Sequence, residues 1–194
     1  MTNPKCPNCG SLDTRKYLYG YPPSNYDSDL YVLGGDVLFE SNPLYHCNNC
    51  GTDFGLMVAK VEGSEILSQH NLENFTFTEY TPSREFTRLI VGEQRGEILV
   101  NVHGTLEEGG DREAEKEYII TEELWEDFKQ RLFNEVYILS WPIEELKHVP
   151  EEPDMWAIHL NFKNGKKFEM VGRDNFPPYY KEFKDVIDQF FIYD

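Results

Sequence analysis

The sequence has little basic charge and no long apolar run, and each shortage argues against a class of protein. Its 194 residues include 18 lysines and arginines against 35 aspartates and glutamates, a formal net charge of −17. Nucleic-acid affinity rests largely on lysine and arginine side chains that release counterions from phosphates, so a broad DNA- or RNA-binding surface is disfavoured. No stretch approaches the roughly 18–20 consecutive apolar residues of a membrane-spanning helix, and we expect no membrane segment.

The first residues, Met-Thr-Asn-Pro-Lys-Cys, contain neither the charged nor the apolar part of a signal peptide. We therefore expect a cytoplasmic protein. With 40% hydrophobic and 14% aromatic residues, the chain has enough apolar material for one ordinary core and a small accessory module.

The acidic charge is unevenly distributed. Residues 1–60 hold four basic and six acidic side chains, a net charge of −2, which leaves −15 for residues 61–194. An acidic surface often serves solubility alone, and it also attracts basic partners. Both interpretations of the charge remain open at the level of the sequence.

Cysteine is scarce, and its placement is the strongest signal in the chain. The four cysteines form two pairs, Cys6-Pro7-Asn8-Cys9-Gly10 and Cys47-Asn48-Asn49-Cys50-Gly51. A two-residue spacer lets both sulfurs of one turn face the same ion, and two such turns complete a tetrahedron. Glycine after the second cysteine suits a turn that needs positive φ. The spacing predicts one structural Zn²⁺ bound by Cys6, Cys9, Cys47 and Cys50.

Two other uses of paired cysteines fit less well. Disulfides suit an exported protein, whereas cytoplasmic thiols are kept reduced. A thioredoxin-like redox pair usually occurs once, near a βαβ pattern, and here the pair occurs twice. A complete set of four sulfur ligands also leaves no vacancy for His46, the neighbour of Cys47.

The cysteine pairs resemble zinc-ribbon knuckles. The intervening motifs also resemble the N-terminal ribbon of small uncharacterised bacterial proteins, and four motifs in the second half resemble their C-terminal part. The motifs are Tyr19-Gly20-Tyr21-Pro22, Leu33-Gly34-Gly35-Asp36 and Asn42-Pro43-Leu44-Tyr45, then Leu124-Trp125-Glu126-Asp127-Phe128, Asp154-Met155-Trp156-Ala157-Ile158, Asn164-Gly165-Lys166 and Gly172-Arg173-Asp174-Asn175-Phe176-Pro177. Relatives tend to have Asp-Gly before the tryptophan, and Pro153-Asp154-Met155 lacks that glycine. The resemblance implies a zinc ribbon and no particular activity.

Hydrophobic periodicity predicts an α+β fold, with a zinc ribbon over residues 1–62 and an acidic domain over residues 63–194. We expect that domain to be an antiparallel sheet with helices packed on one face. In the ribbon, residues 31–39 are expected to be β structure interrupted by a turn or bulge at Gly34-Gly35, and residues 54–58 are expected to be a strand. Further expected strands are residues 86–91, 97–103, 118–120 and 136–141, and a hairpin over 155–171 that turns at Asn164-Gly165. Helices are expected over residues 122–133, with Thr121 as N-cap, over 142–148, and over 177–191, where Pro177-Pro178 begins the helix. Residues 64–72 are expected to be a short helix or a loop. Residues 104–112 are expected to be a loop.

No catalytic set or cofactor-binding motif stands out. The five histidines, at positions 46, 70, 103, 148 and 159, have no evident partner nucleophile, and we expect His103 and His159 on the solvent face of their strands. The side chains of adjacent acidic residues do not face one another, so these pairs are interpreted as solvated charge: Glu107-Glu108, Glu122-Glu123, Glu144-Glu145 and Glu151-Glu152. Residues 172–180 could form an aromatic recognition lip, but core packing explains them more simply.

These features favour a zinc protein that acts as a macromolecular interaction module. We expect a protein partner, with a basic one suited to the acidic domain. Two alternatives stay open: an enzyme with a dispersed carboxylate or histidine site, and nucleic-acid binding through the ribbon, where Arg15, Lys16 and Tyr17 follow the first cysteine pair.

Overall fold

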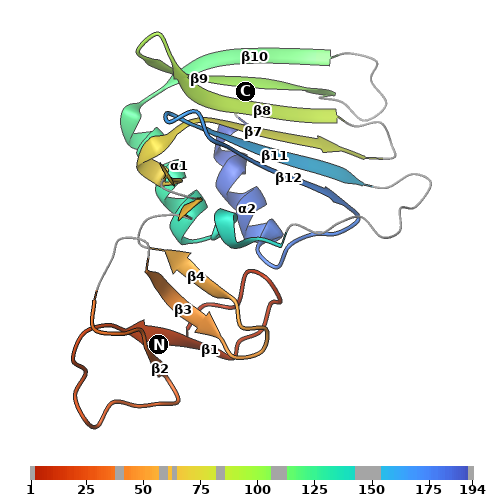
Figure 1. Ribbon diagram of the computed structural model, residues 1–194. Coiled ribbons are helices and arrows are strands. Elements are labelled where there is room, and N and C mark those ends of the chain that lie inside the picture. Colours follow the sequence, from red (N-terminus) through yellow and green to blue (C-terminus); the bar gives the residue numbers. More distant parts are fainter. Residues whose placement is uncertain are drawn as a thin grey trace. The chain divides into compact units, whose positions relative to one another are not determined.

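The computed structural model in Figure 1 consists of two compact units, each assembled from separate stretches of the chain. The structure describes residues 3–37, 42–56, 61–62, 65–81, 86–105, 113–142 and 154–191. The first unit comprises residues 1–69, 130–142 and 177–183, and the second comprises residues 70–129, 143–176 and 184–194. Both units contain a β-sheet, and helices are few among the described residues.

The first unit contains a four-stranded sheet with the order β2-β1-β3-β4. β1 pairs in parallel with β2 and antiparallel with β3, which in turn pairs antiparallel with β4. The strands are β1 (Thr14–Leu18), β2 (Tyr31–Leu33), β3 (Pro43–Cys47) and β4 (Asp53–Leu56), followed by the small pair β5 (Val61–Glu62) and β6 (Glu65–Ile66). The break expected at the Gly-Gly pair within residues 31–39 is confirmed, because β2 ends at Leu33, directly before Gly34, and Gly35 has φ 95°. Residues 38, 39, 57 and 58 of the expected strands lie outside the described residues.

The second unit contains a six-stranded antiparallel sheet with the order β10-β9-β8-β7-β11-β12 (Figure 1). Its strands are β7 (Leu72–Tyr80), β8 (Phe86–Gln94), β9 (Glu97–Thr105), β10 (Glu113–Ile120), β11 (Met155–Phe162) and β12 (Lys167–Arg173). Both predicted hairpins are confirmed, and the third expected strand is longer than residues 118–120. Of the loop expected over residues 104–112, the first two residues continue β9 and residues 106–112 lie outside the described part of the chain.

Buried side chains recur at every second residue on one face of this sheet, because successive side chains of a strand point to opposite faces. The register aligns them across the strands in two rows. One row is Val100, Val91, Phe75, Leu160 and Phe168, and the other is Val102, Leu89, Phe77, Ile158 and Met170. As expected, His103 and His159 lie on the opposite face, half-exposed, each beside its cross-strand partner, Glu115 or Glu169.

Two α-helices occur in the described residues, α1 (Glu122–Asn134) and α2 (Tyr180–Ile187). Thr121 caps α1 as predicted, because its hydroxyl accepts a hydrogen bond from the Leu124 N–H at 3.2 Å. The second helix begins at Tyr180, three residues later than expected, and ends in the 3₁₀ turn η3 (Asp188–Phe190). The other 3₁₀ turns are η1 (Gln69–Asn71) and η2 (Ile138–Ser140).

The strand predicted over residues 136–141 is wrong. Ile138–Ser140 form η2, and Tyr137 has left-handed backbone angles, φ 52° and ψ 45°, which a strand does not allow. The Val136 carbonyl accepts a hydrogen bond from the Trp141 indole at 2.7 Å, and this bond closes the segment into a turn. The segment over 64–72 is also not simply a helix or loop, since it contains β6, η1 and the start of β7. Residues 143–148 of the predicted short helix lie outside the described residues.

Gly172 of β12 makes a close packing contact that leads to a stability prediction. It pairs with Trp156 of β11, and a Cβ atom added at Gly172 would lie 2.2 Å from the indole ring. The ring is held by a 2.9 Å hydrogen bond from its N–H to the Asn175 carbonyl. We expect Gly172→Ala to lower the free energy of unfolding by about 1–3 kcal/mol, as overpacking does. Urea denaturation measures the change, with the half-exposed Val171→Thr as control; equal stability of the two variants would contradict the prediction.

The described helices include none with the length and apolarity required to cross a membrane.

Candidate metal centre

The first cysteine turn, residues 6–10, is closed by its own backbone. The Gly10 N–H donates to the Cys6 carbonyl at 2.9 Å, and the Cys6 N–H donates to the Ser11 carbonyl at 2.8 Å. Gly10 has φ 71°, a left-handed conformation that glycine adopts without strain, as its place after the cysteine predicts.

The second cysteine turn, residues 47–51, repeats this geometry between β3 and β4. The Gly51 N–H donates to the Cys47 carbonyl at 2.9 Å, the Cys47 N–H donates to the Thr52 carbonyl at 2.9 Å, and Gly51 has φ 73°. Two segments about forty residues apart therefore form the same local structure, with the same pattern of backbone hydrogen bonds around each pair of cysteines.

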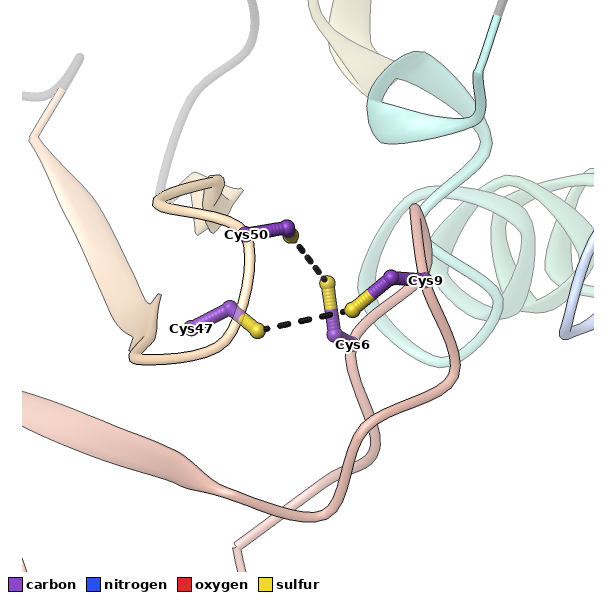
Figure 2. Close-up of side chains that lie close together, drawn as sticks. All are labelled: Cys6, Cys9, Cys47 and Cys50. Atoms are coloured by element: carbon purple, nitrogen blue, oxygen red, sulfur yellow. Dashed lines mark hydrogen bonds between the residues drawn. The ribbon is translucent and has the colours of Figure 1, made fainter.

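The four sulfur atoms converge (Figure 2). All four Sγ atoms lie within 4.8 Å of one another, and the Cys6–Cys50 and Cys9–Cys47 pairs are each separated by 3.7 Å. A tetrahedron of sulfurs about 2.3 Å from a central Zn²⁺ has edges of about 3.8 Å. The predicted set of cysteines is therefore arranged to hold a metal ion, and the spacing fits tetrahedral sulfur coordination.

Burial raises the pKa of two of these thiols, and hydrogen bonding lowers the pKa of Cys50. Burial raises the pKa of Cys6 to about 12 and also raises the pKa of Cys47. Burial acts in the same direction on Cys50, but the contacts of its Sγ with the Thr52 side chain, 3.2 Å away, and with the Thr52 backbone outweigh it and lower the pKa of Cys50 to about 6. A bound cation deprotonates coordinating thiols outright, so it would stabilise the charge that burial opposes at Cys6 and Cys47.

Each turn also supplies an asparagine amide to the other turn's sulfur. The Asn8 Nδ2 lies 3.7 Å from the Cys50 Sγ, and the Asn49 Nδ2 lies 3.6 Å from the Cys9 Sγ. Amide donors of this kind orient ligands and reduce the charge on thiolates. Sequence reasoning missed both residues, although the signal is present: asparagine precedes the second cysteine in both pairs.

An apolar cluster supports the buried side of the site. Cys6, Cys47 and Phe54 are fully buried together, and Tyr45 and Tyr137 pack against them. The rings of Phe54 and Tyr45 stack with their centroids 5.4 Å apart, and Tyr137 meets Phe54 edge-on at 5.3 Å. Tyr137 is distant in sequence from the cysteines, so no local pattern could have assigned it to this cluster.

Residues 177–183 also belong to the unit that holds the cysteines. Tyr179 is buried, its hydroxyl donates to the Lys5 carbonyl at 3.0 Å, and the Lys5 ammonium lies 2.6 Å from the Glu182 carboxylate. Core packing, the simpler interpretation of residues 172–180, therefore holds for Tyr179, whereas Phe176 is 45% exposed.

The other sequence candidates do not join the sulfur cluster. The His46 Nδ1 lies 2.7 Å from the Asp53 carboxylate, which also accepts a hydrogen bond from the Tyr17 hydroxyl at 2.8 Å. Glu122 and Glu123 are exposed in the first turn of α1. His148 and the acidic pairs at 107–108, 144–145 and 151–152 lie outside the described residues.

The first unit thus combines a small β-sheet with four cysteines that are arranged to hold a metal ion, and the second unit contains a larger antiparallel sheet. No protein-family model, no curated protein and no solved structure matches this chain. The cysteine cluster is consistent with the zinc ribbon that the resemblance implies, and the bacterial family stays a prediction.

Proposed function

We propose that this protein binds one structural zinc ion through Cys6, Cys9, Cys47 and Cys50 and acts as an interaction module for a protein partner. The convergence of the four sulfurs within 4.8 Å of one another is the observation that carries the zinc assignment. Four thiolates favour zinc over the harder cations, which prefer oxygen ligands. They also fill its tetrahedral coordination, so the ion would hold the two turns together and would not bind substrate.

Metal analysis of the full chain, purified under reducing conditions, tests the zinc assignment. We expect one zinc per chain, and cobalt substitution should give the visible absorption of a tetrahedral cobalt thiolate. Protein that is folded and fully reduced but contains no metal would overturn the assignment.

The asparagine amides lead to a prediction that separates ligand support from folding. We expect Asn49→Ala to weaken zinc binding about 10–100-fold, the usual cost of losing a group that orients a metal ligand. Asn48→Ala is the matched control, because the Asn48 amide donates to the Asp13 carboxylate at 2.6 Å and not to a sulfur. Competition with a chromogenic chelator measures both affinities. Equal affinities would show that the Asn49 contact with the Cys9 Sγ is unimportant.

The charge of the chain supports a basic protein as partner. Residues 61–194 carry −15 of the formal −17. A field of this size speeds encounter with a positively charged surface, and the effect weakens as salt rises.

Affinity purification from the native host at low and high salt tests the partner. We expect at least one basic protein to be retained at low salt, released at high salt, and absent from beads coated with polyglutamate. Recovery of the same proteins on polyglutamate would show that the interaction is nonspecific charge attraction. Failure to enrich any protein would contradict the proposal.

The proposal extends to the architecture of the second unit, where we infer that the helices cover one face of the six-stranded sheet. Phe128 of α1 meets Phe75 of β7 with ring centroids 5.0 Å apart, and the Lys184 ammonium of α2 lies 4.9 Å from the Phe77 ring. Phe75 and Phe77 are two residues apart in β7 and share a face. The division into residues 1–62 and 63–194 stays a prediction.

A further inference from the structure

A cavity of about 650 Å³ lies at the end of the six-stranded sheet where β8 turns into β9. Its lining comes from η1 and the start of β7, the β8–β9 turn, the end of β10, the first half of α1 and the β11–β12 turn, all within the second unit. Pockets of roughly 300–1,000 Å³ accommodate small ligands or single side chains with their flanking backbone. None of the residues proposed to bind zinc contributes to it.

The indole of Trp125 gives this cavity an unused hydrogen-bond donor. Trp141 donates its indole N–H to the Val136 carbonyl at 2.7 Å, and Trp156 donates to the Asn175 carbonyl at 2.9 Å. Trp125 is 1% exposed and lines the cavity, yet its Nε1 has no hydrogen-bond partner. A buried donor without an acceptor is costly, and a ligand that brings an oxygen atom would remove that cost.

Trp125 also lies close to Glu93, another residue that lines the cavity. The Lys163 ammonium, 2.8 Å from the Glu93 carboxylate, is the main cause of the lowered pKa of Glu93, and the Trp125 N–H contributes in the same direction. The Trp125 Nε1 therefore lies near the Glu93 carboxylate, but it makes no hydrogen bond to it.

The charges of the lining favour a cationic ligand. Five glutamates and three lysines or arginines line the cavity, which gives a formal charge of −2. Two of the basic groups are engaged: the Lys163 ammonium with Glu93, and the Lys129 ammonium, 2.5 Å from the Glu126 carboxylate. Lys129 is 2% exposed, and its ammonium also lies 5.3 Å from the centre of the Trp125 ring. Glu97 and Glu122 are exposed at the rim, where they can pair with a positive group.

We propose that this cavity binds an arginine or lysine residue, with the cationic group paired to rim glutamates and a carbonyl or carboxylate oxygen accepting the Trp125 N–H. The inference rests on the proposed partner interaction and names the group that would be recognised. The same chemistry occurs in a free basic amino acid and in a basic residue within a chain.

The three indole N–H signals of the ¹⁵N-labelled full-length protein provide the test. Trp125→Phe assigns the Trp125 signal, and the titrants are L-arginine, N-acetyl-arginine-amide and the uncharged N-acetyl-glutamine-amide at matched ionic strength. We expect a saturable shift of the Trp125 signal with an arginine compound, with Kd on the order of 1 mM for a ligand of this size. A shift with the free amino acid alone identifies a small-molecule ligand, and a shift with the amide identifies a residue within a chain.

The variant Glu97→Gln/Glu122→Gln should weaken this binding about 5–10-fold, because the pairing charges at the rim are lost. Both side chains are exposed, so the fold should be retained. The inference is wrong if no arginine compound gives a saturable shift, if the glutamine compound shifts the signal equally, or if the variant binds with unchanged affinity. If a partner is recovered from the host but no arginine compound shifts the signal, the partner binds at another surface and the inference about the cavity is wrong. If arginine shifts the signal but no partner is recovered, the cavity is a site for an amino acid and the proposed partner interaction is wrong.

Discussion

Replacing Cys47 with serine should abolish zinc binding and unfold the cysteine-bearing part of the first unit. Cys47 is fully buried beside Cys6 and Phe54, and it ends β3. A serine hydroxyl does not ionise near neutral pH, so only three thiolates would remain. Structural zinc contributes on the order of 10–16 kcal/mol to the folding of small zinc-finger peptides, and the four-stranded sheet has few fully buried side chains to replace that contribution. Zinc per chain and the dispersion of amide resonances measure the outcome.

The control for this variant is Leu12→Ser, close to the first cysteine turn. Leu12 is 78% exposed, so the variant should keep one zinc per chain and a folded ribbon. Resonances of the six-stranded sheet should change little in either variant, because that sheet buries its own apolar rows. Retention of a full zinc equivalent by Cys47→Ser would disprove the four-cysteine site.

The metal centre could be predicted from sequence because its geometry is local. Each turn is fixed by two cysteines, two spacer residues and a glycine, and hydrogen bonds within the turn orient both thiols. Only the meeting of the two turns depends on the rest of the fold. The supporting residues Tyr137 and Tyr179 are different, because they reach the ribbon from distant segments and have no spacing relation to the cysteines.

The sheet of the second unit was predicted in part. The hairpins were found because they alternate apolar and polar residues around recognisable turns. β7 was missed, although Phe75 and Phe77 alternate with Thr76 and Thr78. Glu73 and Asn74 before it and Glu79 after it obscure this alternation. Besides its neighbour β8, β7 pairs with β11, which lies about eighty residues further along the chain. A long-range pairing of this kind leaves no local mark in the sequence.

The failed strand over residues 136–141 has a different cause. Val136, Ile138 and Trp141 are all buried, and such an apolar run satisfies a strand pattern. These residues are instead buried because the chain turns at the end of α1, where the Glu135 and Val136 N–H groups both donate hydrogen bonds to the Arg131 carbonyl. Residues directly after a helix can therefore bury apolar side chains through tight turns, which periodicity alone does not distinguish from a strand.

Phe128→Ala should be the most damaging single substitution in the core of the second unit. Phe128 is fully buried, and its ring lies 5.0 Å from Phe75, 5.0 Å from Phe190 and 5.5 Å from Trp125, measured between centroids. One side chain thus links α1 to the sheet and to η3. Removal of a buried phenylalanine costs about 3–5 kcal/mol, which at about 2–4 °C per kcal/mol corresponds to a fall in Tm of roughly 6–20 °C.

Phe176→Ala is the matched control, since it removes the same ring from a position that is 45% exposed in the same unit. We expect it to change the free energy of unfolding by less than about 1 kcal/mol. Thermal denaturation of the zinc-loaded protein compares the two variants while the first unit remains intact. Because Trp125 stacks on Phe128, the Phe128 variant should also broaden or shift the Trp125 indole signal, whereas Phe176→Ala should not. Equal stability of the two variants would mean that the aromatic cluster around Phe128 is not what joins α1 to the sheet.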